Sequence, residues 1–288
     1  MNTKVHVHLS PLLALVVATI SCAQSDSPTS GDTGPTMKVA IEFELLLNGE
    51  KVTCTDTFEN VGSGSTSMQL ADARLFIQNL SLIDADGNKE AVMLDSDSDY
   101  QGPSVALLDF ENASELCAEN GTKTTHTTLT GKVAEGSYEG LSFSVGVPEH
   151  LNHGDPTTAD PPLDQAALQW NWNDGYRFMR FDLMPGGGTV FDVHIGSTQC
   201  DKGTDGVVTC NQPNRAKVIL SSFDLQQDRV VLDLGVLLSG SDLDADLPGC
   251  IAGGTPDTCA PIFERLGINS SSGNANATKQ QVFRAEPR

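Results

Sequence analysis

The segment KVAIEFELLLNGEKVTC, residues 38–54, decides the fold class. Its apolar side chains occupy every second position, at Val39, Ile41, Phe43, Leu45 and Leu47. A period of two places these side chains on one face of a β-strand, whereas a helix needs a period of about 3.6. The residues NGE that follow are typical of a tight turn. We therefore expect a half-buried strand that ends in a hairpin.

The same alternation recurs along the chain, each time beside residues that favour turns. It appears in RLFIQNLSLIDADGNKEAVML (74–94, with a turn at DADGN), EGLSFSVGVP (139–148), GYRFMRFDLMPGGGTVFDVHIG (175–196) and AKVILSSFDLQQDRVVLDLGVLL (216–238). Short helices are expected only in PLDQAALQW (162–170) and APIFERLG (260–267). Many short strands separated by turns predict an all-β fold, an antiparallel β-sandwich or a barrel-like domain with a few short helices.

The N-terminus resembles a bacterial export signal. A lysine and two histidines precede an apolar run over residues 12–20, which is too short to span a bilayer. The run ends in TISC, which resembles a lipobox with Cys22 as the lipidated residue, although Thr19 is a weaker choice there than leucine. We expect residues 1–21 to be a lipoprotein-type signal peptide, with cleavage at an ordinary signal-peptide site nearby as the alternative. An aspartate close after the lipidated cysteine would oppose sorting to an outer membrane, and Gln24 is not an aspartate.

The remaining chain divides into a tether and one domain. Residues 22–36 are polar and rich in Pro, Gly and Ser, which is typical of a flexible linker. Residues 37–288 show neither a repeat of fixed period nor a break in composition, so they are expected to form a single β-rich domain. The expected location is the periplasm, or the outer membrane and cell surface, with a lipid anchor as the sole membrane attachment.

The formal net charge of −21 excludes some partners. Such a chain repels phosphate, which argues against nucleic acid and against adsorption to anionic lipid. It is compatible with cations, although many exported proteins are acidic for solubility alone.

Six cysteines follow Cys22, and an even number in an exported chain predicts three disulfides. Spacing favours Cys200–Cys210 and Cys250–Cys259 as local loops, which leaves Cys54–Cys117 as the long-range bridge, although other connectivities stay open. A thiolate metal site is the alternative, but no CxxC pair occurs.

Histidines provide the candidate metal ligands. His150 and His153 lie in the loop VGVPEHLNHGDP (145–156), with Asp155 two residues beyond. His194 belongs to TVFDVHIG (189–196), where alternation places it opposite the apolar face and predicts that it is exposed. Neutral imidazole is a good ligand for Cu, Zn or Ni, and Asp155 would orient His153 or add a ligand. From spacing alone, a solvated HxxH loop and a hydrogen-bonded strand histidine are the more common explanations of these residues.

Other motifs support a second hypothesis, a β-sandwich adhesion or carbohydrate-binding module. SDLDAD carries Asp242, Asp244 and Asp246, whose alternating carboxylates would chelate calcium, and Trp170 and Trp172 would form a stacking platform. The turn DADGN lacks the glutamate of a calcium loop. Neither GxSxG nor an assembled Ser/His/Asp set is present, so we do not expect an enzyme.

Eight segments in order resemble the MbnP family of copper-binding periplasmic proteins, formerly the metallo-mystery pair, four-Cys motif proteins. They are ARLFIQNLSLIDADG, VALLDFENASELC, YEGLSFSVGVPEHLNHGDP, LQWNWNDGYRFMRFDL, FDVHIGSTQC, NRAKVILSSFD, GSDLDADLPGC and CAPIFERLG. The resemblance covers residues 38–286 and includes the cysteine positions.

The resemblance implies one copper ion bound through histidine nitrogens, His153 of LNHGDP and His194 of FDVHIGST. It also implies a tryptophan oxidised to kynurenine by a partner similar to the di-haem cytochrome c peroxidases (MbnH-like). Trp172 is the first choice for that residue and Trp170 the second, and in some relatives the oxidised tryptophan lies closer in sequence to a ligand histidine. His150 is an accessory or merely exposed residue. The implied function is copper acquisition, storage or handling at the cell envelope.

Overall fold

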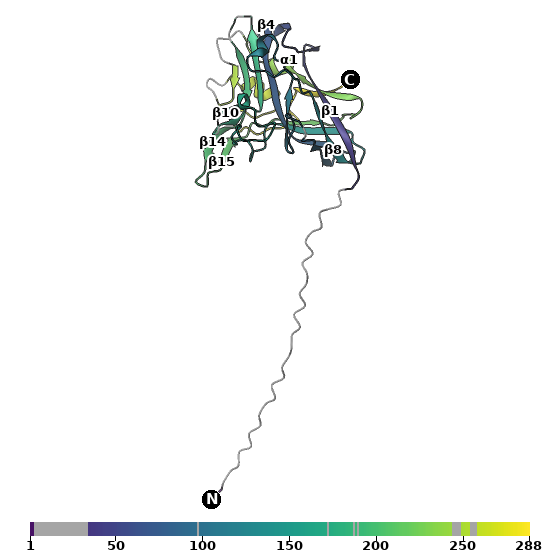
Figure 1. Ribbon diagram of the computed structural model, residues 1–288, viewed down its shortest axis with the longest axis vertical. Helices are drawn as coiled ribbons and strands as arrows, with labels where there is room; N and C mark the ends of the chain where they lie inside the picture. Colours follow the sequence, from purple (N-terminus) through teal and green to yellow (C-terminus); the bar gives the residue numbers. More distant parts are fainter. Residues whose placement is uncertain are drawn as a thin grey trace. The chain divides into compact units, whose positions relative to one another are not determined.

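The computed structural model describes residues 1–2, 34–96, 98–171, 173–186, 188, 190–243, 249–253 and 258–288 (Figure 1). Gly34–Arg288 forms one compact unit, separate from Met1–Thr33. Apart from residues 1–2, the expected signal peptide lies outside the described residues, as do Cys22 and most of the tether. Among those residues, no helix is both long and apolar enough to cross a membrane.

Most of the described strands belong to two large sheets. The nine-stranded sheet contains β3 (Thr57–Val61), β4 (Thr66–Ile83), β5 (Lys89–Ala91), β7 (Val105–Asp109), β9 (Gly140–Val145), β12 (Met179–Pro185), β13 (Phe191–Ile195), β16 (Lys217–Leu220) and β18 (Gly249–Ile251). The six-stranded sheet contains β1 (Thr36–Leu47), β2 (Glu50–Lys51), β6 (Met93–Leu94), β8 (Thr128–Ala134), β17 (Asp228–Asp233) and β19 (Phe283–Pro287).

The remaining described elements are two small hairpins and four short helical turns. The hairpins pair β10 (Gln169–Asn171) with β11 (Gly175–Tyr176), and β14 (Thr198–Lys202) with β15 (Val208–Gln212). The helical turns are the 3-10 turns η1 (Glu115–Ala118) and η2 (Ala166–Leu168) and the α-helices α1 (Leu234–Leu238) and α2 (Ala260–Arg265).

Strand β4 organises the larger sheet because it pairs along both of its edges. One edge pairs first with β12 and then with β9, and the other edge pairs in turn with β3, β7 and β5. The change from β12 to β9 precedes a bulge between Gln78 and Ser81, where Asn79 has a φ of 54°. A bulge bends a strand and increases its twist, which lets one strand serve two groups of partners.

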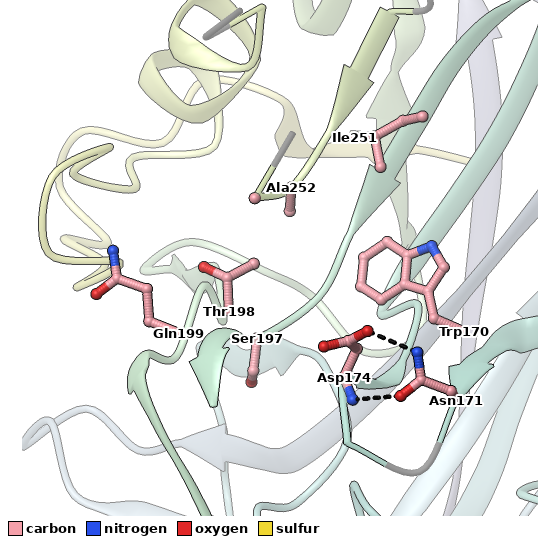
Figure 2. Close-up of a pocket in the computed structure, with 9 residues that line it drawn as sticks. Trp170, Asn171, Asp174, Ser197, Thr198, Gln199, Ile251 and Ala252 are labelled. Atoms are coloured by element: carbon pink, nitrogen blue, oxygen red, sulfur yellow. Dashed lines mark hydrogen bonds between the residues drawn. The ribbon is translucent and has the colours of Figure 1, made fainter. Parts of the chain in front are cut away.

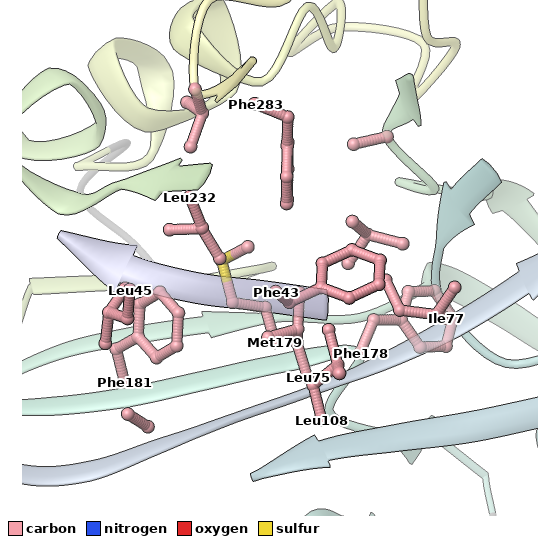
Figure 3. Packing of buried hydrophobic residues seen from close by; sticks show 14 of the residues in the cluster. Phe43, Leu45, Leu75, Ile77, Leu108, Phe178, Met179, Phe181, Leu232 and Phe283 are labelled. Carbon is pink, nitrogen blue, oxygen red and sulfur yellow. The ribbon is translucent and has the colours of Figure 1, made fainter. Parts of the chain in front are cut away.

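The two sheets pack face to face through an apolar core (Figure 3). Phe43 of β1 meets Phe143 of β9 at a ring-centroid distance of 5.6 Å, and Phe143 meets Phe283 of β19 at 5.3 Å, both edge to face. Leu75 and Met179 of the larger sheet are buried in the same cluster. Facing sheets with interdigitated apolar side chains define a β-sandwich.

The second face of the larger sheet is also covered, in this case by loops. Arg74 of β4 donates to the backbone oxygen of Asn120 at 3.1 Å, and Arg180 of β12 donates to that of Ala167 at 3.0 Å. The loop segments 111–122 and 147–177 therefore close over charged side chains, which explains why both faces of β4 are buried over its central residues.

The all-β prediction is confirmed, with three differences in detail. Among the described strands, two pairs, β1–β17 and β13–β18, are parallel rather than antiparallel, and both join segments that are too distant in sequence for a local hairpin signal to predict them. Residues 162–170 contain only the turn η2 before β10 instead of a helix. Helix α1 was not expected, and Asp233 caps it by accepting from the Val236 nitrogen at 2.9 Å.

Three disulfides connect the described cysteines: Cys54–Cys117, Cys200–Cys210 and Cys250–Cys259. These are the pairs that the spacing favours. The first links residues 63 positions apart and is buried beside β4, whereas the second closes a hairpin over 10 positions.

We predict that loss of Cys54–Cys117 destabilises the protein most. A cross-link removes more entropy from the unfolded chain when its loop is longer, which gives about 4 kcal/mol for this bridge and about 3 kcal/mol for Cys200–Cys210. The Cys54→Ala/Cys117→Ala variant also loses buried packing. Urea unfolding of this variant and of Cys200→Ala/Cys210→Ala measures the difference. An equal or larger loss in the second variant would contradict the prediction.

Candidate metal centre

His194 lies on β13, on the sheet face that the loops cover. It is opposite the apolar face, as alternation predicted, because Phe191, Val193 and Ile195 enter the core. The expectation that it is exposed is wrong, since only 8% of its surface is accessible. The loops that cover this face come from distant parts of the chain, which alternation within one strand does not reveal.

Asp182 on the neighbouring strand β12 is the nearest polar partner of His194. Its Oδ1 lies 2.6 Å from His194 Nε2, and its Oδ2 accepts from Arg180 Nε at 3.0 Å and Nη2 at 2.6 Å. Burial alone would raise the pKa of Asp182, but hydrogen bonds from His194 and Arg180 outweigh it and lower the pKa to about 2. The carboxylate is therefore ionised at neutral pH.

These side chains belong to a larger charged layer across the covered face. Strand register aligns two rows, which are Asp109–Arg74–Arg180–His194 and Asp72–Asp182–Asp192. Arg74 forms an ion pair with Asp72, and Arg180 contacts Asp72 at 3.2 Å as well as Asp182. Buried charges are tolerated when they are paired and hydrogen-bonded, so removal of one member leaves its partner uncompensated.

Sequence reasoning missed Asp182 and Arg180 as functional candidates. A signal was present, because alternation in RFMRFDLM places both on one face of the strand that precedes His194. It was not interpretable without knowing that β12 and β13 pair and that loops cover this face.

His153 lies in a series of turns and is half-buried. Its Nε2 is 3.4 Å from Cys210 Sγ in the Cys200–Cys210 disulfide and 3.2 Å from Asn152 Nδ2. Backbone bonds from Leu151 to Pro148 and from Asn152 to Glu149, at 2.9 and 3.2 Å, fix the preceding turn. The loop is thus an ordered part of the domain that rests on the β14–β15 hairpin.

The β10–β11 hairpin contacts the loop of His153. Asn152, which is fully buried, accepts from the Tyr176 backbone nitrogen at 3.0 Å through Oδ1. Gln169 Nε2 donates to the Gly154 backbone oxygen at 2.6 Å. Both residues that flank His153 are therefore hydrogen-bonded to this hairpin.

The same hairpin contacts the end of the strand that carries His194. The backbone nitrogen of Phe178, just after β11, donates to the Ile195 oxygen at 2.5 Å. Gly196 packs so closely on the Trp170 ring that a Cβ at this position would clash with it. The β10–β11 hairpin therefore lies between the two segments that carry the predicted histidine ligands.

A pocket of about 500 Å³ opens beside this hairpin (Figure 2). Its lining joins Trp170 to the start of β14, to Ile251 of β18, which is the register partner of His194, and to Ala252, which follows β18. The Ala252 nitrogen donates to the His194 backbone oxygen at 2.9 Å. The pocket therefore borders the backbone of His194, and Figure 2 shows the Trp170 indole at its wall.

Of the remaining predicted site residues, some lie outside the described part of the chain and others have a defined position. Trp172, Asp244 and Asp246 lie outside the described residues. Trp170 is half-buried, with the Arg177 guanidinium 5.4 Å from the centre of its ring, so part of a stacking surface is already occupied. His150 is exposed, and exposed Asp155 accepts from the Thr157 nitrogen at 2.9 Å as part of a turn.

Within the described residues, three groups bring potential metal-ligand atoms within 4.8 Å of one another. Two of these groups contain disulfide cysteines: one is His153 with Cys200 and Cys210, and the other is Glu111 with Cys54 and Cys117. The sulfurs of these cysteines form disulfides and are therefore not thiolates. The third is Asp182, Asp192 and His194. None of these groups holds both His153 and His194.

These features define a class of protein: a disulfide-bonded β-sandwich with ordered histidines on either side of a tryptophan-bearing hairpin. A family model described as MbnP matches residues 36–252. The chain belongs to the MbnP family.

A solved structure, MbnP from Methylosinus trichosporium, has the same fold with a TM-score of 0.79. The two sequences are 30% identical, and the match covers 88% of this chain and 99% of that chain. No curated protein sequence matches this chain significantly.

Asp109, at the far end of the charged layer, is expected to make the free energy of unfolding depend on pH. Burial raises the pKa of this carboxyl group to about 7. A hydrogen bond from Thr122 acts in the opposite direction, the negative charge of Glu111 raises the pKa, and the positive charge of Arg74 lowers it. Between about pH 4 and pH 7 the folded protein keeps a proton that the unfolded chain releases, so the free energy of unfolding falls as pH rises.

We expect Asp109→Asn to flatten this dependence, as measured by urea unfolding at several pH values. Asp84→Asn is the control, because hydrogen bonds from Asn88 lower the pKa of Asp84 and move its effect to more acidic pH. Equal slopes for the wild type and Asp109→Asn would show that Asp109 does not hold the extra proton.

Proposed function

We propose that the protein binds copper at the bacterial cell envelope, for acquisition, storage or handling of the metal. Membership of the MbnP family supports a copper-related role, and three disulfides suit an oxidising compartment outside the cytoplasm. We further propose that Cys22 is lipidated and anchors the chain, and that the protein is not itself an enzyme.

The proposed ligands are nitrogens of His153 and His194. The observation that carries this proposal is that one hairpin contacts both histidine-bearing segments, through Asn152 and Tyr176 on one side and Gly196 and Trp170 on the other. Imidazole binds both oxidation states of copper, and the disulfides remove the thiolates that would compete for the ion. Copper would be held without using the protein's cysteines.

Trp172 follows β10 directly in sequence and is our first choice for the residue oxidised to kynurenine, with Trp170 second. Kynurenine would add an amine and a carbonyl to a site that two histidines leave incomplete. The oxidation requires an external oxidant, for which we propose a di-haem partner similar to cytochrome c peroxidases. His150 and Asp155 are proposed at most as accessory residues.

We predict that His153→Ala and His194→Ala each abolish stoichiometric copper. His194→Ala also removes a hydrogen-bond partner of buried Asp182 and lowers stability, but Arg180 still pairs with that carboxylate, so both variants stay folded. The measurement is elemental analysis of the mature protein from a copper-supplemented periplasm, expressed with and without a di-haem partner. His150→Ala is the matched control in the same loop and is expected to keep its copper. Full copper content in both ligand variants would rule out these residues as ligands.

Trp172→Phe provides a separate test of the modified residue. If Trp172 is the oxidised tryptophan, peptide mass spectrometry of the co-expressed wild type finds kynurenine at position 172, and the variant binds copper more weakly. Unmodified Trp172 beside an oxidised Trp170 would move the assignment to Trp170.

A further inference from the structure

We infer that Asp182 is a positioning residue that fixes the tautomer of His194, so that this histidine binds metal through Nδ1. The inference rests on the proposed function for its link to copper, but the tautomer itself is a property of the metal-free protein. It adds a residue from a neighbouring strand to a site so far assigned only to histidines and a tryptophan.

The hydrogen-bond directions follow from Arg180. A guanidinium only donates, and Arg180 directs Nε and Nη2 at Oδ2 of Asp182, at 3.0 and 2.6 Å. Oδ2 is therefore held as an acceptor, and Oδ1 of the same carboxylate faces His194 Nε2 at 2.6 Å. An ionised carboxylate accepts and does not donate, so Nε2 carries the proton and the lone pair of the ring resides on Nδ1.

Arg180 is itself fixed by the surrounding charged layer. Its Nε also lies 3.2 Å from Asp72, and its Nη1 donates to the Ala167 oxygen at 3.0 Å. Asp182 is only 9% exposed, so water does not readily replace His194 as its partner. The carboxylate is consequently preorganised before any metal binds, as expected for a group that orients a ligand histidine.

The competing arrangement has a metal bound by Nε2 together with Asp182 and Asp192. The distances disfavour it, because the separation of 2.6 Å is that of a direct hydrogen bond and Arg180 already neutralises Asp182. Asp192 lies farther away, with its Oδ1 3.9 Å from Nε2, which is beyond hydrogen-bonding distance. The geometry therefore favours Asp182 as a hydrogen-bond acceptor over Asp182 as a metal ligand.

An isosteric substitution distinguishes these roles. In Asp182→Asn, the guanidinium of Arg180 still requires an oxygen, so the amide oxygen turns to Arg180 and the NH2 group turns to His194. Nε2 must then accept, and the proton moves to Nδ1, which blocks the nitrogen proposed to bind metal. One amide in place of one carboxylate is expected to reverse the tautomer with little change in volume.

The test is long-range proton–nitrogen NMR of the metal-free mature protein labelled with nitrogen-15, at one neutral pH. The expected result is protonated Nε2 for His194 in the wild type and protonated Nδ1 in Asp182→Asn. Asp192→Asn is the matched control on the same face and is expected to keep the wild-type tautomer. Protonated Nδ1 in the wild type would overturn the inference. If Asp182→Asn does not fold, the wild-type spectrum alone shows which nitrogen of His194 carries the proton.

Copper titration of the same samples separates this inference from the proposed function. We expect Asp182→Asn to bind copper about tenfold to a hundredfold more weakly than the wild type, and Asp192→Asn to bind within a few-fold of it. A reversed tautomer with unchanged copper affinity would overturn the role of Nδ1. A wild type that has the expected tautomer but no copper affinity would contradict the proposed function and leave the assignment of the tautomer to Asp182 standing.

Discussion

The rest of the structure depends on the pairing of β4 along both edges. Because β12 and β9 follow one another on one edge and β3, β7 and β5 on the other, a single strand fixes the register of most of the larger sheet. That register aligns Arg74 with Arg180 and Asp72 with Asp182. Charged groups that the sequence spreads over many residues are thereby brought into one layer.

The charged layer in turn constrains the candidate metal centre. Loops cover it, so each charge must find a partner within the protein, and Arg180 satisfies two carboxylates while it contacts the backbone of Ala167. His194 stands at one end of this layer and Asp109 at the other. The orientation of the histidine is therefore determined by the balance of buried charge across several strands, and the β-sandwich is more than a support for the loops.

Local pattern predicted much of this architecture. Alternation correctly separated Phe191, Val193 and Ile195 from Asp192 and His194, and spacing favoured the disulfide pairs that the structure contains. What local pattern missed depends on contacts between distant segments, such as the parallel pairing of β1 with β17 and the loops that bury His194. The short helix expected over residues 162–170 is instead the turn η2 followed by β10, and Asn171 closes the next turn by accepting from the Asp174 nitrogen at 3.0 Å.

The double-edged pairing of β4 also bears on the order of folding. The chain emerges from its N-terminus, so β4 is available long before the residues of β12 that complete one of its edges. Until then the part of β4 that pairs with β12 has unpaired backbone groups along that edge. Unpaired strand edges promote association between chains. Productive folding thus depends on keeping this edge of β4 unpaired until the second half of the domain is available.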